Sequence, residues 1–481
     1  MNAPQDSSAP LIVAEAGISI GSLQHLSPAA RFVPPADLEA AAAAEASARD
    51  VICITKDRDI AMRVSHRAGV IPVWLDDHAR SNVLSDPSVV TIHDTSKLAA
   101  YFDDAAAPPI LGLARWRPSD TRTQLFDRLS YLLEAAGVAG GITVYGAGTI
   151  GRQAINAARL IGLPVKAILD ANAELHGTKI DGIEVRPLSS VTKGTDVVVP
   201  ALGRHIVAIT NALHEHGVHS VMSLSELYYI SRRPGEPETD YLDDLFANRH
   251  RYHSLFLALA DLRSREVLSA VLEHRLSLAT NHLSKVAERS HAQWFDPAFL
   301  PRTESDVFVD GGAFDGDTVL GYVEARGPDY KHIHAFEIDP DVSARAVSRT
   351  AHLTNVTIHS CGLSDREALA SYRKTGGTDG AIGHHAGNSR RVALRTIDTA
   401  VHERITFLKL DVEGEEAKTI DGARHHLKND RPALAVALYH KAHDMWDIPR
   451  RILDLLPDYR LHLRHYTDTA YETIVYAIRG Q

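Results

Sequence analysis

The stretch Asp306-Val-Phe-Val-Asp-Gly-Gly-Ala-Phe-Asp-Gly-Asp-Thr318 decides the fold of the C-terminal part of this 481-residue chain. Its apolar residues 307–309 predict a buried β-strand that ends at an acidic residue, Asp310. The small residues after Asp310 permit a tight turn and the close approach of a ligand, and a helix is expected to begin near Thr318. Backbone N–H groups at the N-terminus of such a helix would suit a carboxylate or another anionic part of a ligand.

Four further strands are predicted downstream, and polar residues follow the end of each. The second strand, 332–337, ends at Glu337, where a carboxylate can bind both hydroxyls of a ribose. The third strand leads to Ser364 and Asp365, the fourth to Asp411 and Glu413, and the fifth to Tyr439 and His440. Ligands of open α/β sheets bind at the edge where the strands end. We therefore expect these side chains to converge on one site.

In this order, the motifs resemble those of S-adenosylmethionine-dependent methyltransferases of the FkbM type. The resemblance covers at least residues 300–440, and a lead-in at Gln293-Trp-Phe295 is similar to that of multidomain members. The chain departs from the family in having Ile338 after Glu337, where proline is more usual. The motifs that carry the resemblance are 310–318, Ala335-Phe-Glu-Ile-Asp-Pro340, Gly362-Leu-Ser-Asp365, Leu394-Arg-Thr-Ile-Asp398, and 407–416 with Gly422-Ala423.

The resemblance implies a class I methyltransferase fold with S-adenosylmethionine as cofactor. It also implies an enzyme that O-methylates a hydroxyl of a sugar, glycan or related secondary metabolite. Asp315 or Asp317 could cap the following helix, and for Asp315 this role is favoured over ligand contact. The implied cofactor-binding residues are Asp310, Gly312 and Gly316 around the methionine part, Glu337 on the ribose, and Ser364 with Asp365 beside the adenine.

Methyl transfer to a hydroxyl requires alignment of oxygen, carbon and sulfur, and removal of the hydroxyl proton. The predicted catalytic residues are Asp411, Glu413 and His440, and histidine is the easiest base near neutral pH. Alternatively, these three residues bind a divalent metal ion that acidifies the hydroxyl. Lys409 is expected to lie within its strand and to pair with one of the acids.

A second glycine turn, Gly146-Ala-Gly-Thr-Ile-Gly151, follows a predicted strand, opens a helix and is followed by Asp170. This is the spacing of a dinucleotide-binding fingerprint, so a nicotinamide-dependent oxidoreductase is an alternative function. No Tyr-x-x-x-Lys pair follows a fourth strand, and the region 169–185 resembles accessory domains of sugar-processing enzymes. We therefore favour a scaffold or sugar-nucleotide-binding module. A catalytically silent protein is a third hypothesis, against which the intact carboxylates of the C-terminal region argue.

The chain is expected to have four segments. Residues 1–120 form an uncharacterised α/β segment with a disordered N-terminal tail, in which 51–55 and 70–75 are predicted strands. A Rossmann-like nucleotide-binding-type domain is expected over 121–235. A helical connector over 236–300 precedes the FkbM-type methyltransferase domain over 301–481. The predicted fold class is therefore α/β, with a C-terminal class I methyltransferase sheet, a second Rossmann-like domain and a helical connector.

The composition limits the partners of the protein. Lys and Arg number 51 against 61 Asp and Glu, giving a formal net charge of -10, which argues against nucleic acid. Two cysteines, Cys53 and Cys361, cannot form a disulfide framework and favour a cytoplasmic location. No apolar run approaches the roughly 20 residues of a membrane span. We expect a small-molecule or glycan acceptor, while its identity and the oligomeric state cannot be predicted.

Overall fold

The computed structural model describes residues 118–288, 293–300, 305–376, 379–382 and 390–480, together with five strands before residue 93. The chain packs as two compact units, the first comprising Met1–Glu134 with Asp240–His282 and the second Ala135–Thr239 with Leu283–Gln481. The predicted disordered tail lies outside the described residues. The four-segment division of the chain stays a prediction.

The first unit contains a parallel five-stranded sheet with the strand order β2-β1-β3-β4-β5. The strands predicted at 51–55 and 70–75 are present as β3 and β4, and they pair in parallel. Helix α11 begins after Asp261, whose carboxylate accepts the backbone N–H of Ser264 at 2.7 Å and so caps the helix. The elements that begin in this unit are β1 (Leu11–Glu15), β2 (Arg31–Val33), β3 (Val51–Thr55), β4 (Val70–Leu75), β5 (Val90–Ile92), α5 (Pro118–Ala139), α9 (Tyr241–Ala247), α10 (Arg249–Ala258), α11 (Leu262–Ser277) and α12 (Asn281–Ser284).

The second unit begins with a Rossmann-like sheet of order β11-β10-β6-β7-β9-β8. All neighbours pair in parallel except β8 and β9. The Val-rich strand at 197–200 and its neighbour at 142–145 are buried throughout, as expected for the centre of a sheet covered on both faces. Its elements are β6 (Ile142–Tyr145), α6 (Thr149–Leu160), β7 (Val165–Leu169), β8 (Lys179–Ile180), β9 (Ile183–Arg186), β10 (Val197–Pro200), α7 (Ile206–Glu215), β11 (Ser220–Val221) and α8 (Leu224–Ser231).

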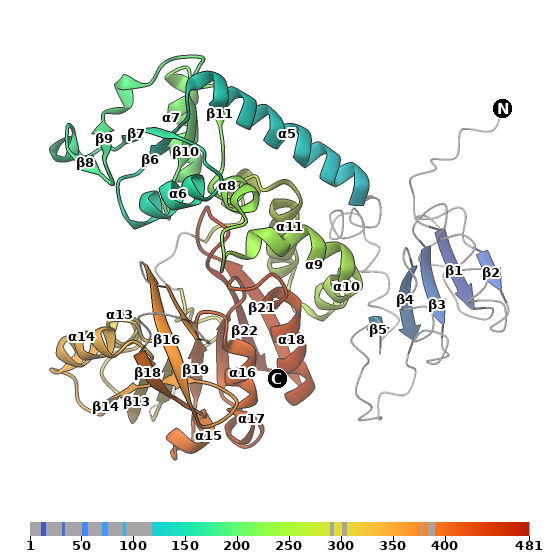
Figure 1. Cartoon of the computed structure of the whole chain (residues 1–481). Helices are drawn as coiled ribbons and strands as arrows, with labels where there is room; N and C mark the ends of the chain where they lie inside the picture. Colours follow the sequence, from blue (N-terminus) through green and yellow to red (C-terminus); the bar gives the residue numbers. More distant parts are fainter. Residues whose placement is uncertain are drawn as a thin grey trace. The chain divides into compact units, whose positions relative to one another are not determined.

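The C-terminal sheet has seven strands in the order β14-β13-β12-β19-β20-β22-β21. The first five are parallel, and β22 runs antiparallel to both β20 and β21 (Figure 1). The carboxyl ends of β12, β13, β19 and β20 therefore share one edge. The elements are β12 (Val307–Gly311), α13 (Asp317–Arg326), β13 (His332–Glu337), α14 (Pro340–Thr350), β14 (Val356–Ser360), β19 (Phe407–Leu410), α16 (Glu416–Asp421), α17 (Arg424–Asp430), β20 (Ala433–Ala437), α18 (Asp444–Leu455), β21 (Tyr459–His465) and β22 (Thr473–Arg479).

A smaller sheet lies between β14 and β19 in the chain and has the order β15-β18-β16-β17. Strands β16 and β17 pair antiparallel. Its elements are β15 (Gly362–Leu363), β16 (Ala368–Gly376), β17 (Asp379–Ile382), β18 (Arg390–Arg395) and the short helix α15 (Ile397–Ala400).

Aromatic residues hold the lead-in segment against the C-terminal sheet. Phe308 of β12 stacks on Tyr322 of α13 at 4.6 Å and on Phe407 of β19 at 4.9 Å between ring centroids. Phe295 packs edge-on against all three rings, at 5.6 to 6.1 Å. Such pairs add to the burial of large apolar side chains. The lead-in is therefore part of the domain core.

Among the described residues, we find no helix with the length and apolar character needed to cross a bilayer.

Candidate active site

The glycine turn after β12 has a backbone that few residues other than glycine tolerate. Gly312 has a φ of 81°, and a Cβ atom at this position would lie 1.8 Å from the carbonyl oxygen of Asp411. Phe314 also has a positive φ, of 46°. The absence of a side chain at Gly312 lets the end of β12 approach the end of β19 closely. Asp310 and Asp411 therefore lie at the same edge of the sheet, as the sequence predicts.

Helix α13 begins at this turn without a side-chain cap. Gly316, with a φ of 86°, is its N-cap residue, and no side chain accepts a hydrogen bond there. Of the two residues predicted to cap the helix, Asp315 pairs with Arg349 instead, whereas the Asp317 carboxylate accepts the backbone N–H of Thr318 at 2.8 Å. The N-cap position thus offers no side chain of its own, but the Thr318 N–H in the first turn is already used by a carboxylate of the protein.

Glu337, at the end of β13, fastens this turn from the neighbouring strand. Its Oε2 accepts the backbone N–H of Phe314 at 3.0 Å, and its Oε1 accepts that of Asp339 at 2.7 Å. Burial raises the pKa of Glu337, while the two backbone N–H groups oppose that change. A carboxylate offers about four lone-pair sites, so these two bonds leave roughly two acceptor positions for a ligand.

Asp310 and Lys409 form a fully buried ion pair on adjacent strands. The two residues are register partners of β12 and β19, and Lys409 Nζ lies 2.9 Å from Asp310 Oδ1. The same ammonium donates to the carbonyl of Gly312 at 2.7 Å and lies 5.1 Å from the ring centroid of Trp294. Burial raises the pKa of Asp310 to about 6, against the effect of the ammonium. Lys409 thus neutralises Asp310 and braces the turn, as its expected pairing with an acid implied.

The predicted catalytic residues gather around His440. Its Nε2 lies 3.5 Å from Asp411 Oδ1 and 3.5 Å from Glu413 Oε2. Its Nδ1 lies 2.9 Å from Oε1 of Glu416, a carboxylate that is completely buried. Tyr439 donates to Asp411 Oδ1 at 2.8 Å. The structure therefore brings Asp411, Glu413 and His440 together.

The charge state of His440 follows from this arrangement. Burial alone would lower the pKa of His440, but Glu416, Asp411 and Glu413 outweigh it and raise the pKa to about 10. In the protein without a metal ion, the ring is therefore an imidazolium at neutral pH. An imidazolium cannot accept a proton, and the catalytic role of His440 stays a prediction.

Two acids of the site were not predicted from the sequence. Glu416 lies in the first turn of α16, where an acid favours the helix dipole, and it also accepts the N–H groups of Val412 and Gly414 at 2.8 and 3.3 Å and pairs with His440. Glu472 precedes β22 and accepts a hydrogen bond from Gln293 of the lead-in. Burial, with Asp411 adding to it, raises the pKa of Glu472 to about 7. The sequence signal for Glu416 is its position two residues after Gly414, within reach of that turn's N–H groups.

Ser364 and Asp365, predicted beside the adenine, follow β15. The Ser364 hydroxyl donates to Asp365 at 3.2 Å, and a Cβ atom on Gly422 would lie 2.0 Å from the Ser364 carbonyl oxygen. Ser364 is buried and Asp365 is exposed. In the described part of the chain, no hydrogen bond or ion pair joins either residue to Glu337, and their adenine role stays a prediction.

The second glycine turn repeats the geometry of the first. Asp170 Oδ2 accepts the N–H of Ala147 at 2.8 Å, and Oδ1 accepts that of Asn172 at 2.8 Å. In both domains the carboxylate accepts the N–H of a turn residue that lies 23 residues before it in the sequence. A Cβ atom on Gly151 would lie 1.9 Å from the carbonyl oxygen of Gly146, whereas one on Gly148 would meet no atom within 4 Å. Gly148 therefore leaves open space at the N-terminus of α6.

Comparison with known protein families decides what the C-terminal region is. The family described as "Methyltransferase FkbM domain" matches residues 310–466, a span that contains the glycine turn, Glu337 and the His440 cluster. These residues form an FkbM methyltransferase domain. The fold class predicted from the sequence is confirmed, and the match of this domain to the family supports S-adenosylmethionine-dependent methyl transfer.

Solved structures extend this similarity. A crystal structure of methyltransferase FkbM from Methylobacillus flagellatus KT matches 75% of this chain and 100% of its own, at 20% identity and a TM-score of 0.58. An rRNA methylase from Streptococcus thermophilus matches 42% of this chain and 98% of its own, at 14% identity and a TM-score of 0.27. Fibrillarin from Aeropyrum pernix, with natively bound S-adenosyl-L-methionine, matches 37% of this chain and 69% of its own, at 15% identity and a TM-score of 0.26.

The first of these similarities shows the fold and extends beyond the FkbM domain. The other two, with TM-scores under 0.3, add no argument. No match was found among curated proteins.

Proposed function

We propose that the protein transfers a methyl group from S-adenosylmethionine to a hydroxyl of a sugar, glycan or related secondary metabolite. The observation that carries the proposal is the convergence of Asp411, Glu413 and His440 beside the glycine turn of β12. An oxygen nucleophile needs a group that removes its proton as the methyl group arrives. Carboxylates at the cofactor edge supply such groups. The formal net charge of -10 favours a small-molecule or glycan acceptor over nucleic acid, and the scarcity of cysteine fits a cytoplasmic location.

The cofactor is proposed to lie along the turn from Asp310 to Gly316. The N-terminus of α13, where Gly316 provides no side-chain cap, would face the carboxylate of its methionine part, beside the Thr318 N–H that Asp317 already binds. Asp310 is completely buried, and its Oδ2 accepts no hydrogen bond within the described residues, so an ammonium group is a suitable partner. Glu337 would use its remaining acceptor positions for the ribose hydroxyls. Ser364 and Asp365 complete the proposed cofactor-binding set beside the adenine.

Asp411 is proposed to take the hydroxyl proton. Its Oδ1 is engaged by Tyr439, and no hydrogen bond to Oδ2 is found within the described residues. His440, as an imidazolium, would keep its proton and hold the carboxylates of Asp411 and Glu413 in place. Glu413 is then the second carboxylate at the acceptor position. The histidine positions the base instead of acting as one.

Changing Asp411 to asparagine is expected to lower turnover at least about 100-fold, because general base catalysis contributes that much or more. The affinity for S-adenosylhomocysteine should stay within about twofold, because no cofactor contact is lost. A change of that size lies well below the tenfold change that corresponds to 1.4 kcal/mol. Radiolabelled methyl transfer to an acceptor found by screening measures the first, and calorimetry the second. Asp341→Asn, at an exposed site, is the matched control. Unchanged turnover in Asp411→Asn would exclude this residue as the base.

A metal-assisted route is a second candidate because one donor atom each from Asp411, Glu416 and His440 lies within 4.8 Å of the others. Glu416 replaces Glu413 in this set. A divalent ion there would supply a Lewis acid for the acceptor hydroxyl, and His440 would have to give up its proton to bind it. Activity that disappears with a chelator and returns with added metal favours this route. Activity that persists in the chelator leaves Asp411 as the base.

The Rossmann-like domain is proposed to bind a nucleotide, with a sugar nucleotide favoured over a nicotinamide cofactor. The open space at Gly148 and the position of Asp170 beside the turn support the proposal. A pyrophosphate at the N-terminus of α6 and a ribose on Asp170 would follow the fingerprint.

Calorimetric titration of the full-length protein with UDP-glucose and with NAD⁺ tests this. We expect binding of the sugar nucleotide to weaken about tenfold or more in Asp170→Ala, because hydrogen bonds to a charged group contribute about 1.5–3 kcal/mol. Asp181→Ala is the matched control, since that carboxylate pairs with Arg159 at the surface. Binding of NAD⁺ alone would favour the oxidoreductase alternative, and binding of neither would leave a scaffold.

A further inference from the structure

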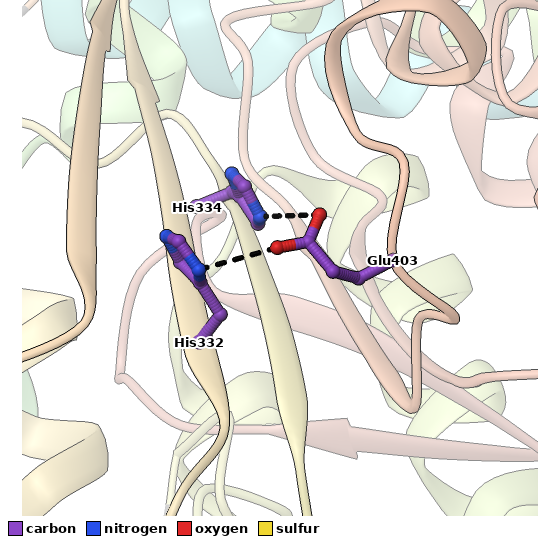
Figure 2. A group of neighbouring side chains, drawn as sticks. All are labelled: His332, His334 and Glu403. Carbon is purple, nitrogen blue, oxygen red and sulfur yellow. Dashed lines mark ion pairs between the residues drawn. The ribbon is translucent and has the colours of Figure 1, made fainter.

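A histidine pair lies on β13, outside the cofactor edge. His332 and His334 are two residues apart on one strand, so their side chains share a face of the sheet. Their rings stack with centroids 4.1 Å apart. Glu403 lies in the segment before β19 and reaches both rings from there (Figure 2). Its Oε1 lies 3.2 Å from His332 Nδ1, and its Oε2 lies 3.3 Å from His334 Nε2.

The second nitrogen of each ring has a partner on β14. His332 Nε2 lies 2.8 Å from Thr357 Oγ1, and His334 Nδ1 lies 3.1 Å from His359 Nε2. Metal-binding histidines almost always engage their other nitrogen in this way, which fixes the ring and its tautomer. With those nitrogens engaged, His332 Nδ1 and His334 Nε2 are the atoms that face Glu403 (Figure 2).

One of these two atoms is buried without a hydrogen bond. The His334 side chain is only 7% exposed, and its Nε2 lies near Glu403 without the geometry of a hydrogen bond. Buried polar atoms in folded proteins are normally satisfied, so this nitrogen points to a missing partner.

We propose that His332, His334 and Glu403 bind a divalent transition-metal ion of the zinc type. One donor atom from each residue lies within 4.8 Å of the others. Two imidazoles and a carboxylate suit zinc, whereas magnesium and calcium prefer sites made of oxygen atoms. Three protein ligands leave a fourth position for water.

The ion would lie away from the cofactor edge. His332 is the first residue of β13, and Glu403 precedes the first residue of β19, so the cluster lies toward the amino ends of the strands. Glu337 and Asp411 lie at their carboxyl ends. The metal therefore joins the segment before β19 to β13, and it is expected to stabilise the domain without entering methyl transfer.

Titration of the full-length, chelator-treated protein with zinc tests the proposal. We expect one tight equivalent of zinc, unchanged by excess magnesium, and a rise in the melting temperature on binding. His334→Gln should weaken the tight site at least about 100-fold, since changes to second-shell residues alone cost 10–100-fold. Thr357→Val, which removes the partner of His332 Nε2, should weaken it about tenfold. His352→Gln, at an exposed histidine, is the matched control and should bind as the wild type does.

Two further variants separate this site from the His440 cluster and from misfolding. The His440→Gln variant should still bind one tight equivalent of zinc. If His440→Gln loses this equivalent while His334→Gln retains it, the proposal is overturned. If His334→Gln does not fold, as judged by circular dichroism, His332→Gln and Glu403→Gln replace it, because both positions are about a quarter exposed. Weak binding of several equivalents that is equal in all variants would show adventitious zinc on surface histidines and would also overturn the proposal.

Discussion

Replacing Lys409 with methionine is expected to lower the free energy of unfolding by about 3–5 kcal/mol, because it leaves the buried Asp310 without its counter-charge. Lys409 is 1% exposed and Asp310 is completely buried, so water cannot take the place of the ammonium. The carbonyl of Gly312 would lose its donor at the same time. Hydrogen exchange of the amides in β12 and β19 measures the change where it occurs.

A double variant and a surface variant make this result specific. Asp310→Asn with Lys409→Met removes both charges, and it should recover much of the lost stability because uncharged groups of similar shape replace a buried pair with little cost. Lys418→Met breaks an exposed pair with Glu415 and should change stability by less than about 1 kcal/mol. If Lys409→Met is as mild as Lys418→Met, the Asp310–Lys409 pair does not hold the turn.

Changing Glu337 to alanine is expected to weaken binding of S-adenosylhomocysteine about 100-fold. Each hydrogen bond to a charged group contributes about 1.5–3 kcal/mol, and two ribose bonds therefore correspond to a factor of about 100 or more. The substitution also removes the hydrogen-bond acceptor of the Phe314 and Asp339 N–H groups, so the turn is less well held in place. Calorimetric titration measures the affinity directly.

Two further substitutions test whether the carboxylate itself is responsible. Glu337→Gln keeps the shape and one acceptor oxygen but removes the charge, and it should fall between the wild type and Glu337→Ala. Glu324→Ala, at an exposed position on α13, should bind as the wild type does. Wild-type affinity in Glu337→Ala would remove the ribose assignment.

The strand ends were predictable because a local pattern determines them. Apolar runs followed by acidic or glycine residues placed Asp310, Glu337 and Asp411 at one edge, and the parallel sheet does bring them there. The pairing of Lys409 also followed from its position in a strand whose neighbour ends in an acid. These inferences needed only side-chain period and the rule that parallel strands end together.

The remaining features depend on contacts between distant parts of the chain. The role of Glu416 in the site could not be predicted, because its contacts with the Val412 and Gly414 N–H groups depend on the shape of the loop. The raised pKa of His440 arises from three carboxylates, so no single residue indicated it. Glu403, in the segment before β19, lies beside His334 of β13, although the two residues are far apart in sequence. Packing alone creates these groups.

The repeated turn has a consequence for ligands that contain adenosine. A carboxylate fastens the turn in each Rossmann-like domain, with Ala147 in one turn and Phe314 in the other. If both turns bind a nucleotide as we propose, an inhibitor that relies on adenosine contacts alone would find two similar binding sites in one polypeptide. Selectivity for the methyltransferase would have to come from the methionine end, which we propose to lie beside the buried charge pair of Asp310 and Lys409.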